Sequence, residues 1–189
     1  MSHLNSPLHD KETIQQWVQQ ARAGDEMAFT RLVETFGGRL QSMIYRMLLD
    51  WDETRDVAQE TFIHAYRALS RYRPSGRFQS WLFQIGARQA LDALRKRKRR
   101  FEHFQGTNKK EEEIGKEDST VARNEIVRAI EEAVQELPAE QRIAFVMAEY
   151  EGCSYQEIAS VIGGSSKRVE MHLYRARFTL RARLKLYLS

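Results

Sequence analysis

Three carboxylates recur at four-residue spacing about a third of the way along the chain. Asp52, Asp56 and Glu60 would share one face of a helix. Carboxylates bind divalent cations, so a metal-dependent nuclease is one chemistry to consider. The outer two would lie ~12 Å apart along the helix axis, however, which is too far for one ion. We therefore expect an exposed acidic docking face, or a merely solvated one, and no metal site.

Basic residues gather in two short segments. Residues 88–100 and residues 165–185 each carry seven Lys or Arg against one acidic residue, a local charge of +6. The whole chain carries only +4, so the remaining residues sum to −8. Two basic patches on an otherwise acidic chain indicate a polyanionic partner such as a nucleic acid.

Aromatic residues precede the first basic run, residues 95–100. They are Tyr72, Phe78, Trp81 and Phe83. Aromatic faces stack on unpaired bases while arginines hold the backbone, so this order is typical of a protein that binds single strands. The alternative is that these side chains belong to the core. We favour the core for Phe83, and for Phe78 and Trp81 the two interpretations stay open.

The second basic segment follows a helix-turn-helix pattern. Ser154 and Glu157 form a capping box ahead of a short apolar helix, and Gly163-Gly164 then turns the chain into a long helix. In such a motif the start of the second helix enters the major groove of DNA. The alternative is a solvated amphipathic helix that ends a small bundle. The groove-contact candidates are Ser165, Ser166, Lys167, Arg168, Met171, His172 and Arg175.

Signals for other chemistry are missing from the sequence. The five histidines show no zinc-ligand spacing with the single cysteine, Cys153, and the segment GGSSK lacks the spacing of a phosphate-binding loop. One cysteine forms no intramolecular disulfide, and the longest apolar run is far too short to cross a bilayer. The N-terminus resembles no secretory signal. We expect a cytoplasmic protein with no cofactor and no membrane insertion.

The elements that position these residues are expected to be helices. Only 10 Gly and 3 Pro occur among 189 residues, too few for a many-stranded fold. Apolar residues recur at helical spacing within residues 1–100 and 121–189, whereas residues 101–120 are polar and aperiodic. We expect an all-α protein: two small helical domains joined by a flexible linker over residues 101–120, the second domain containing the helix-turn-helix.

Local signals predict where the helices begin and end. Asp25 can cap the second helix and Asp52 the third. Gly37-Gly38 should break or bend the helix between them. A further helix should begin near Phe78 or Ser80 and run into the basic residues that end at Arg100.

Four short motifs occur in order along the chain. The first is D-x-x-Q-E-x-F at residues 56–62, and the second is F-x-x-W-L-x-x-I at residues 78–85 with the basic run behind it. The third is LP-x-x-x-R at residues 137–142, and the fourth is EGCSYQEIA ahead of a helix that ends in YRAR. The ordered set, over about residues 10–188, resembles bacterial sigma factors of the sigma-70 class, specifically the extracytoplasmic-function (ECF) group.

This resemblance implies a non-enzymatic subunit of RNA polymerase that directs promoter-specific transcription and melts promoter DNA. The first domain would bind the clamp helices of the β′ subunit through Asp56, Gln59 and Glu60. The second would meet the β flap and read the minus-thirty-five element with the groove-contact candidates. An anti-sigma factor is a further expected partner. The minus-ten element, with a base extruded, would contact Arg71, Tyr72, Arg73, Ser75, Arg77, Phe78, Trp81, Arg88, Arg95, Lys96, Arg97 and Lys98.

Three residues depart from the family pattern. Arg88 stands where asparagine is usual and is expected to contact phosphate, and Gly164 replaces an apolar turn residue. Glu170 lies in the recognition helix, where it would either accept a hydrogen bond from cytosine or repel phosphate. The alternative function is a helix-turn-helix regulator. Such a regulator would bind duplex DNA tightly without polymerase, whereas a sigma factor would not, so this measurement distinguishes the two functions.

Overall fold

The chain is helical throughout the residues that the computed structural model describes, which are 11–73, 77–104 and 121–185. The N-terminal half contains α1 (Lys11–Arg22), α2 (Glu26–Leu48), α3 (Trp51–Ala68), the short 3-10 helix η1 (Leu69–Arg71) and α4 (Phe78–Phe104). The C-terminal half contains α5 (Val121–Gln135), α6 (Ala139–Glu149), α7 (Tyr155–Ile162) and α8 (Ser166–Arg183). The expected all-α class is confirmed. None of these helices is both long and apolar enough to span a membrane.

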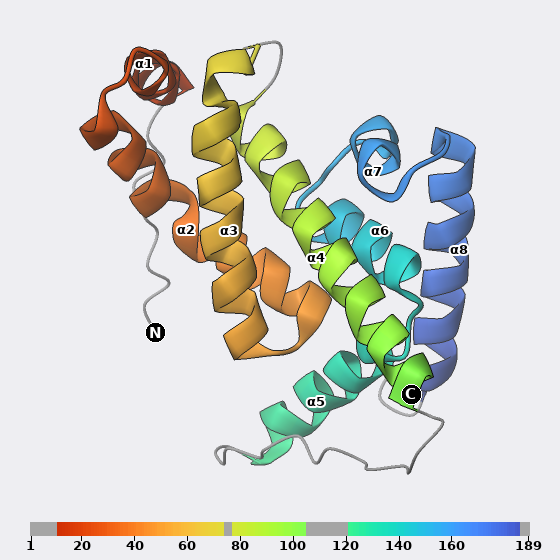
Figure 1. The fold of residues 1–189 in the computed structure, drawn as a ribbon. Helices are drawn as coiled ribbons and strands as arrows, with labels where there is room; N and C mark the ends of the chain where they lie inside the picture. Colours follow the sequence, from red (N-terminus) through yellow and green to blue (C-terminus); the bar gives the residue numbers. More distant parts are fainter. Residues whose placement is uncertain (1–10, 74–76, 105–120, 186–189) are drawn as a thin grey trace.

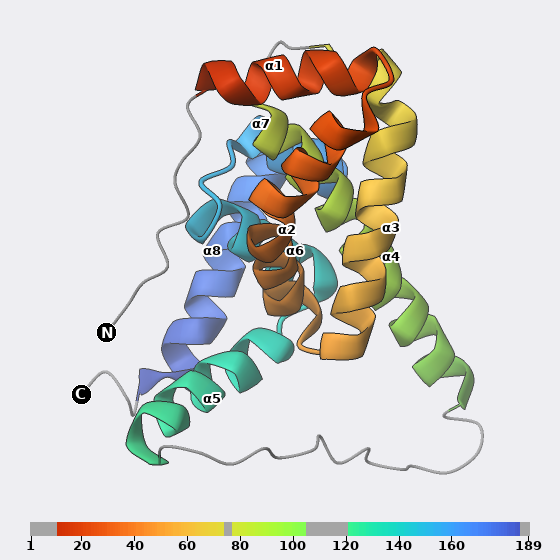
Figure 2. The same cartoon turned by 90° about the vertical axis from the view of Figure 1, so that its left-hand side faces the viewer.

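Helix α4 lies between the two halves (Figure 1). α2 and α3 pack against one side of it, and α6 and α7 against the other. α1 lies across one end of the N-terminal half and contacts α2, η1 and α4, whereas α5 lies near the opposite end and contacts α8 (Figure 2). The helix that carries the first basic run is therefore covered from both sides.

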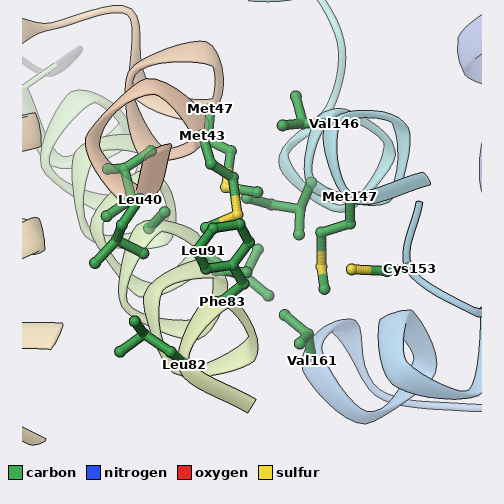
Figure 3. Packing of buried hydrophobic residues seen from close by; sticks show 14 of the residues in the cluster. Leu40, Met43, Met47, Leu82, Phe83, Leu91, Val146, Met147, Cys153 and Val161 are labelled. Carbon is green, nitrogen blue, oxygen red and sulfur yellow. The ribbon is translucent and has the colours of Figure 1, made fainter. Parts of the chain in front are cut away.

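One apolar core joins the halves. Phe83 and Leu91 of α4 and Met47 of α2 belong to the same buried cluster as Met147 of α6 and Val161 of α7 (Figure 3). A smaller buried cluster lies mainly between α5 and α8. The two expected helical groups are thus packed directly on one another.

Gly86 allows α2 and α4 to approach closely. A Cβ atom placed on Gly86 would lie 2.8 Å from Cδ1 of Leu40, closer than carbon atoms pack. Leu40 is itself fully buried in α2 and has little room to move. Because glycine has no side chain, α2 and α4 can pack at this short distance at Gly86.

The capping predictions had mixed outcomes. Asp25 caps α2 as expected, because its carboxylate accepts a hydrogen bond from the Ala28 amide at 3.1 Å. The prediction for Asp52 was wrong. Asp50 caps α3 instead and accepts from the Glu53 amide at 2.8 Å. The helix begins directly after Asp50, and this leaves Asp52 exposed in its first turn.

Two helices continue further than the sequence indicated. A break at Gly37-Gly38, one of the two outcomes expected there, is absent, because α2 runs unbroken through both glycines. Phe36 and Leu40 are buried on either side of them, so packing on the core outweighs the weak helix propensity of glycine. α4 runs to Phe104, past the boundary expected at Arg100. The rest of the expected linker, residues 105–120, lies outside the described residues.

Cys153 is expected to be unreactive in the folded chain. Burial, with Glu157 and Glu151 nearby, raises the pKa of its thiol to about 12. Only the thiolate attacks disulfide reagents, so at pH 8 we expect DTNB to label the native protein at least ~100-fold more slowly than the protein in urea. Stopped-flow absorbance measures both rates. Labelling of the native chain at the rate of the unfolded one would contradict the packing described for this residue.

Candidate functional site

One of the three docking candidates on α3 lines an apolar groove. Asp56, Gln59 and Glu60 are all exposed, and Gln59 lines a groove of about 840 Å³ between α2 and α3. Glu60 pairs with His64 at 3.0 Å. The apolar lining comprises Ala58 and five larger side chains: Phe29, Val33, Phe62, Ile63 and Tyr66. The charged lining is mixed, with Glu26, Arg55 and Arg67, so the groove fits the apolar face of a partner helix.

The lining of this groove was not predicted from the sequence. Phe29, Val33 and Phe62 follow the helical period, which is typical of core residues, but all three are partly exposed. The sequence did contain one signal for the groove, the width of the apolar faces of α2 and α3. Both helices carry more large apolar residues than a single stripe facing the core needs.

Two carboxylates of the acidic face have partners on their own helix. Asp52 pairs with Arg55 and Glu60 with His64. Within the described ranges, no three His, Cys, Asp or Glu side chains lie close enough together to hold a metal.

The aromatic residues before the basic run form one cluster. The ring centroids of Tyr72 and Phe78 lie 5.9 Å apart, and Trp81 lies 4.8 Å from Tyr72 and 5.5 Å from Phe78. Tyr72 and Phe78 are buried, and burial raises the pKa of Tyr72. Trp81 is partly exposed. Of these three side chains only Trp81 is therefore partly accessible, and it packs against the buried rings of Tyr72 and Phe78.

A cavity of about 430 Å³ lies beside the aromatic cluster. Tyr72 and Phe78 form part of its wall, and one face of α1 forms another part. Lys11, Arg22 and Arg77 contribute positive charge, and no acidic residue is among its described lining. No motif in the sequence connected α1 with this surface. Arg71 and Arg73 are exposed on the same connection, and Ser75 lies outside the described residues.

Three arginines of α4 already have protein partners. Arg88 donates to the Ser160 carbonyl at 3.0 Å, and Arg95 pairs with Glu140 at 3.0 Å. Arg97 pairs with Glu53 at 2.8 Å. Lys96 and Lys98 are exposed next to them. Arginines of α4 are therefore engaged by carboxylate or carbonyl oxygens both within the first basic run and one to two turns before it.

The helix-turn-helix is formed by α7 and α8. The Ser154 and Glu157 capping box begins α7 as expected, and Ser165 caps α8 by accepting from the Arg168 amide at 3.4 Å. Most groove-contact candidates are exposed, and Ser166 and His172 are half-buried. Exposed members are Ser165, Lys167, Arg168, Met171 and Arg175.

His172 acts as a neutral hydrogen-bond partner. Burial, together with Arg168 and Arg175, lowers the pKa of His172, although Glu140 opposes the shift. Arg168 Nε donates to His172 Nε2 at 3.3 Å, which fixes the arginine along the helix surface. The departure at Glu170 is exposed on the same helix, and no described ion pair neutralises it. The groove face of α8 is thus basic with one carboxylate within it.

The turn between α7 and α8 depends on glycine. Gly163 has φ +82° and Gly164 has φ +104°, conformations that L side chains rarely adopt. A Cβ atom on Gly163 meets no neighbour. We expect Gly163→Ala to lower the free energy of unfolding by about 1 kcal/mol through backbone strain alone.

The matched control for this substitution is Gly37→Ala. Gly37 lies inside α2 with open space around its Cα, so alanine there should raise the free energy of unfolding by ~0.5 kcal/mol. Urea titrations followed by circular dichroism measure both values. Equal effects of the two substitutions would show that the turn does not require the left-handed conformation.

Arg142 connects the two halves from within the core. Its guanidinium donates to the Met47 carbonyl at 3.0 Å and the Leu137 carbonyl at 3.3 Å, and it also contacts the Gln135 carbonyl. Burial lowers its pKa to about 10, so it stays charged at neutral pH. Met47 lies in the last turn of α2, where carbonyls lack helical partners. One side chain therefore satisfies the end of α2 and the turn before α6.

Two family models match the chain, one in each half. The Sigma-70 region 2 model matches residues 32–100, from α2 through most of α4. The Sigma-70 region 4 model matches residues 127–180, which include the helix-turn-helix. The groove and the aromatic cluster lie in the first match, and Arg142 and α8 lie in the second.

Several relatives are similar over nearly the whole chain. RNA polymerase sigma-H factor of Pseudomonas aeruginosa is 34% identical over 177 residues, which cover 88% of this chain and 91% of the relative. ECF RNA polymerase sigma-E factors of Salmonella typhimurium and Escherichia coli are 29% identical over 180 residues, covering 90% of this chain and 93% of theirs. The chain belongs to the sigma-70 family, in its ECF group, and is a sigma factor that directs transcription by RNA polymerase.

Solved structures share the fold. CnrH in complex with the cytosolic domain of CnrY has a TM-score of 0.66 at 28% identity and covers 92% of this chain and 98% of its own. The sigma factor RpoE of Bartonella quintana, in complex with the anti-sigma factor NepR, has a TM-score of 0.65 at 22% identity, with 83% and 96% covered. The second likeness supports the fold alone.

Proposed function

We propose that the N-terminal half docks on the β′ clamp helices of core RNA polymerase through the α2–α3 groove, and that the two halves then contact separate promoter elements. The observation that carries the proposal is the apolar groove between α2 and α3, which Gln59 lines, with Asp56 and Glu60 exposed on the same helix. The apolar face of a partner helix would be buried in the groove. The carboxylates of Asp56 and Glu60 would pair with basic residues on that helix. The chain itself is non-catalytic and acts in the cytoplasm.

The minus-ten element would bind at the start and along the length of α4. Trp81 is the side chain with an accessible ring, and the neighbouring cavity of about 430 Å³ is large enough for an extruded base. Arg71, Arg73 and Arg77 surround this end of the helix. Extruding a base costs a few kcal/mol, which stacking and phosphate contacts must supply. Lys96 and Lys98 would hold the backbone further along.

The minus-thirty-five element would bind the start of α8. Lys167, Arg168 and Arg175 project from the helix whose N-terminus follows the turn of the motif, where such helices enter the major groove. Arginine and lysine pair with guanine edges there. The same half would meet the β flap, and an anti-sigma factor would regulate the chain. The structural likeness to CnrH, solved with the cytosolic domain of CnrY, supports the last expectation.

Charge reversal on the docking face is the test of this assignment. We expect Asp56→Lys with Glu60→Lys to weaken binding of the full chain to core polymerase by about tenfold or more, because close charge pairs couple strongly across interfaces. Fluorescence anisotropy with labelled protein measures the dissociation constant. Affinity of the full chain for DNA should not fall, since neither residue touches the proposed DNA surface.

The control variant carries the same change in charge elsewhere. Glu125→Lys with Glu132→Lys alters two exposed carboxylates on α5, a helix that contributes no residue to the described lining of the groove. This variant should bind core polymerase within about twofold of the wild type. Equal weakening by both double variants would refute docking through α3.

A further inference from the structure

We propose that Trp51, stacked on Tyr45, is an aromatic anchor at one end of the α2–α3 groove and binds a basic side chain of the core-polymerase helix that docks there. The inference rests on the proposed function, because it takes this groove as the docking site. It goes beyond that function by adding a contact outside the described lining of the groove and by naming the kind of side chain that it binds.

The two aromatic rings form a stack with one open side. Their centroids lie 4.2 Å apart and the ring planes differ by 18°. Tyr45 is only partly exposed, whereas Trp51 is 58% exposed. An indole left in water in this way gains free energy when a partner covers it. Stacking on Tyr45 also restricts the indole before any partner binds, so less conformational entropy is lost on docking.

The stack continues both walls of the groove. Tyr45 lies one turn beyond Gln41 on α2, and Trp51 lies one turn before Arg55 on α3. Gln41 and Arg55 both line the groove, and residues four apart on a helix share a face. The turn that joins the two helices lies at the end of the N-terminal half opposite α1 (Figure 1). A helix that follows the groove toward this turn therefore reaches the open face of Trp51.

The charges beside the stack favour a basic side chain. Asp50 and Asp52 flank Trp51 in the chain, and the face of an indole ring itself attracts cations. Asp52 pairs with Arg55, and Asp50 lies 3.6 Å from Arg97. Both ion pairs are at least partly exposed to solvent, and such pairs contribute little, so a partner's cation can replace either arginine at small cost. The chemistry of the site thus fits a lysine or arginine placed over the indole.

The experiment measures binding of the labelled full chain to purified core polymerase by fluorescence anisotropy. Trp51→Ala removes the anchor, and Trp51→Phe keeps a smaller ring. Phe101→Ala is the matched control, because Phe101 is an aromatic residue of α4 that is 61% exposed and does not line the groove. Asp56→Lys with Glu60→Lys is measured in the same series. Urea titrations establish that each variant is folded.

We expect Trp51→Ala to raise the dissociation constant about tenfold, because aromatic residues that become buried contribute much of the affinity of an interface. Trp51→Phe should raise it about threefold, since phenylalanine offers less area and attracts cations less strongly. Tyr45→Leu should also raise it about threefold, because an unstacked indole must be ordered when the partner binds. Phe101→Ala should stay within about twofold.

The other outcomes separate the anchor from the docking site. Wild-type affinity for Trp51→Ala, in a series where the charge reversal weakens binding, would overturn the anchor and leave docking on α3 intact. Wild-type affinity for both would refute docking there and the anchor with it. Equal weakening by Trp51→Ala and Phe101→Ala would also overturn it. Light scattering covers one more case: a dimer that Trp51→Ala abolishes, with unchanged affinity for core polymerase, would show that a second copy of this chain covers Trp51 instead.

Discussion

Arg142→Ala is expected to lower the free energy of unfolding by about 3 kcal/mol, the largest effect of any single substitution considered for this chain. The guanidinium is 6% exposed and donates to carbonyls of Met47 and Leu137 that have no other described partner there. Alanine would leave those buried carbonyls without a donor and open a cavity between α2 and α6. Urea denaturation followed by circular dichroism measures the loss.

Arg142→Lys should recover little of this stability. An ammonium group has no planar fork, so it cannot reach two carbonyls from one position. Arg31→Ala is the surface control, since Arg31 is exposed on α2, and it should change stability by less than about 0.5 kcal/mol. A loss below about 1 kcal/mol for Arg142→Ala would show that this side chain does not join the halves.

The second large effect concerns the exposed lysines of α4. Lys96→Gln with Lys98→Gln should weaken binding of the full chain to single-stranded DNA by roughly 25-fold at 0.1 M salt. Each cation that contacts a phosphate contributes about 0.7 to the salt slope on single strands, so the slope should fall by about 1.4. Titrations at several salt concentrations measure the affinity and the slope together.

The control removes two cations elsewhere. Arg31→Gln with Arg128→Gln lowers the net charge by the same amount at exposed positions on α2 and α5. It should weaken binding only slightly and leave the slope unchanged. If the two double variants give the same slope, the basic run does not contact DNA phosphates and the affinity depends only on net charge.

Much of the fold followed from local sequence signals. Asp25, the Ser154–Glu157 capping box and Gly163-Gly164 each act within a few residues, and the structure confirms all of them. The errors came where distant packing decided the outcome. Gly37-Gly38 stays helical because the buried face of α2 packs on the core. Asp50 caps α3 instead of Asp52, so the helix begins two residues earlier than expected.

The sequence indicated which residue types could form the candidate site, but not which of them are buried or which partners they contact. The sequence shows that Tyr72 and Phe78 are aromatic and precede the basic run. It does not show that both side chains are buried and pack against Trp81. The same limit applies to Arg88 and Arg95, whose partners Ser160 and Glu140 lie far along the chain. Contacts between residues far apart in the chain leave no local sequence pattern. The packing of the two halves on one another could therefore be seen only in the structure.

Transcription reconstituted from purified components tests the central claim most directly. Core RNA polymerase is incubated with fragments of the source genome, with and without this chain, and the 5′ ends of the transcripts are sequenced. We expect the chain to bind core polymerase and to produce discrete start sites that share two upstream sequence elements. The same start sites with and without the chain, or no association with core polymerase, would contradict its assignment as a sigma factor.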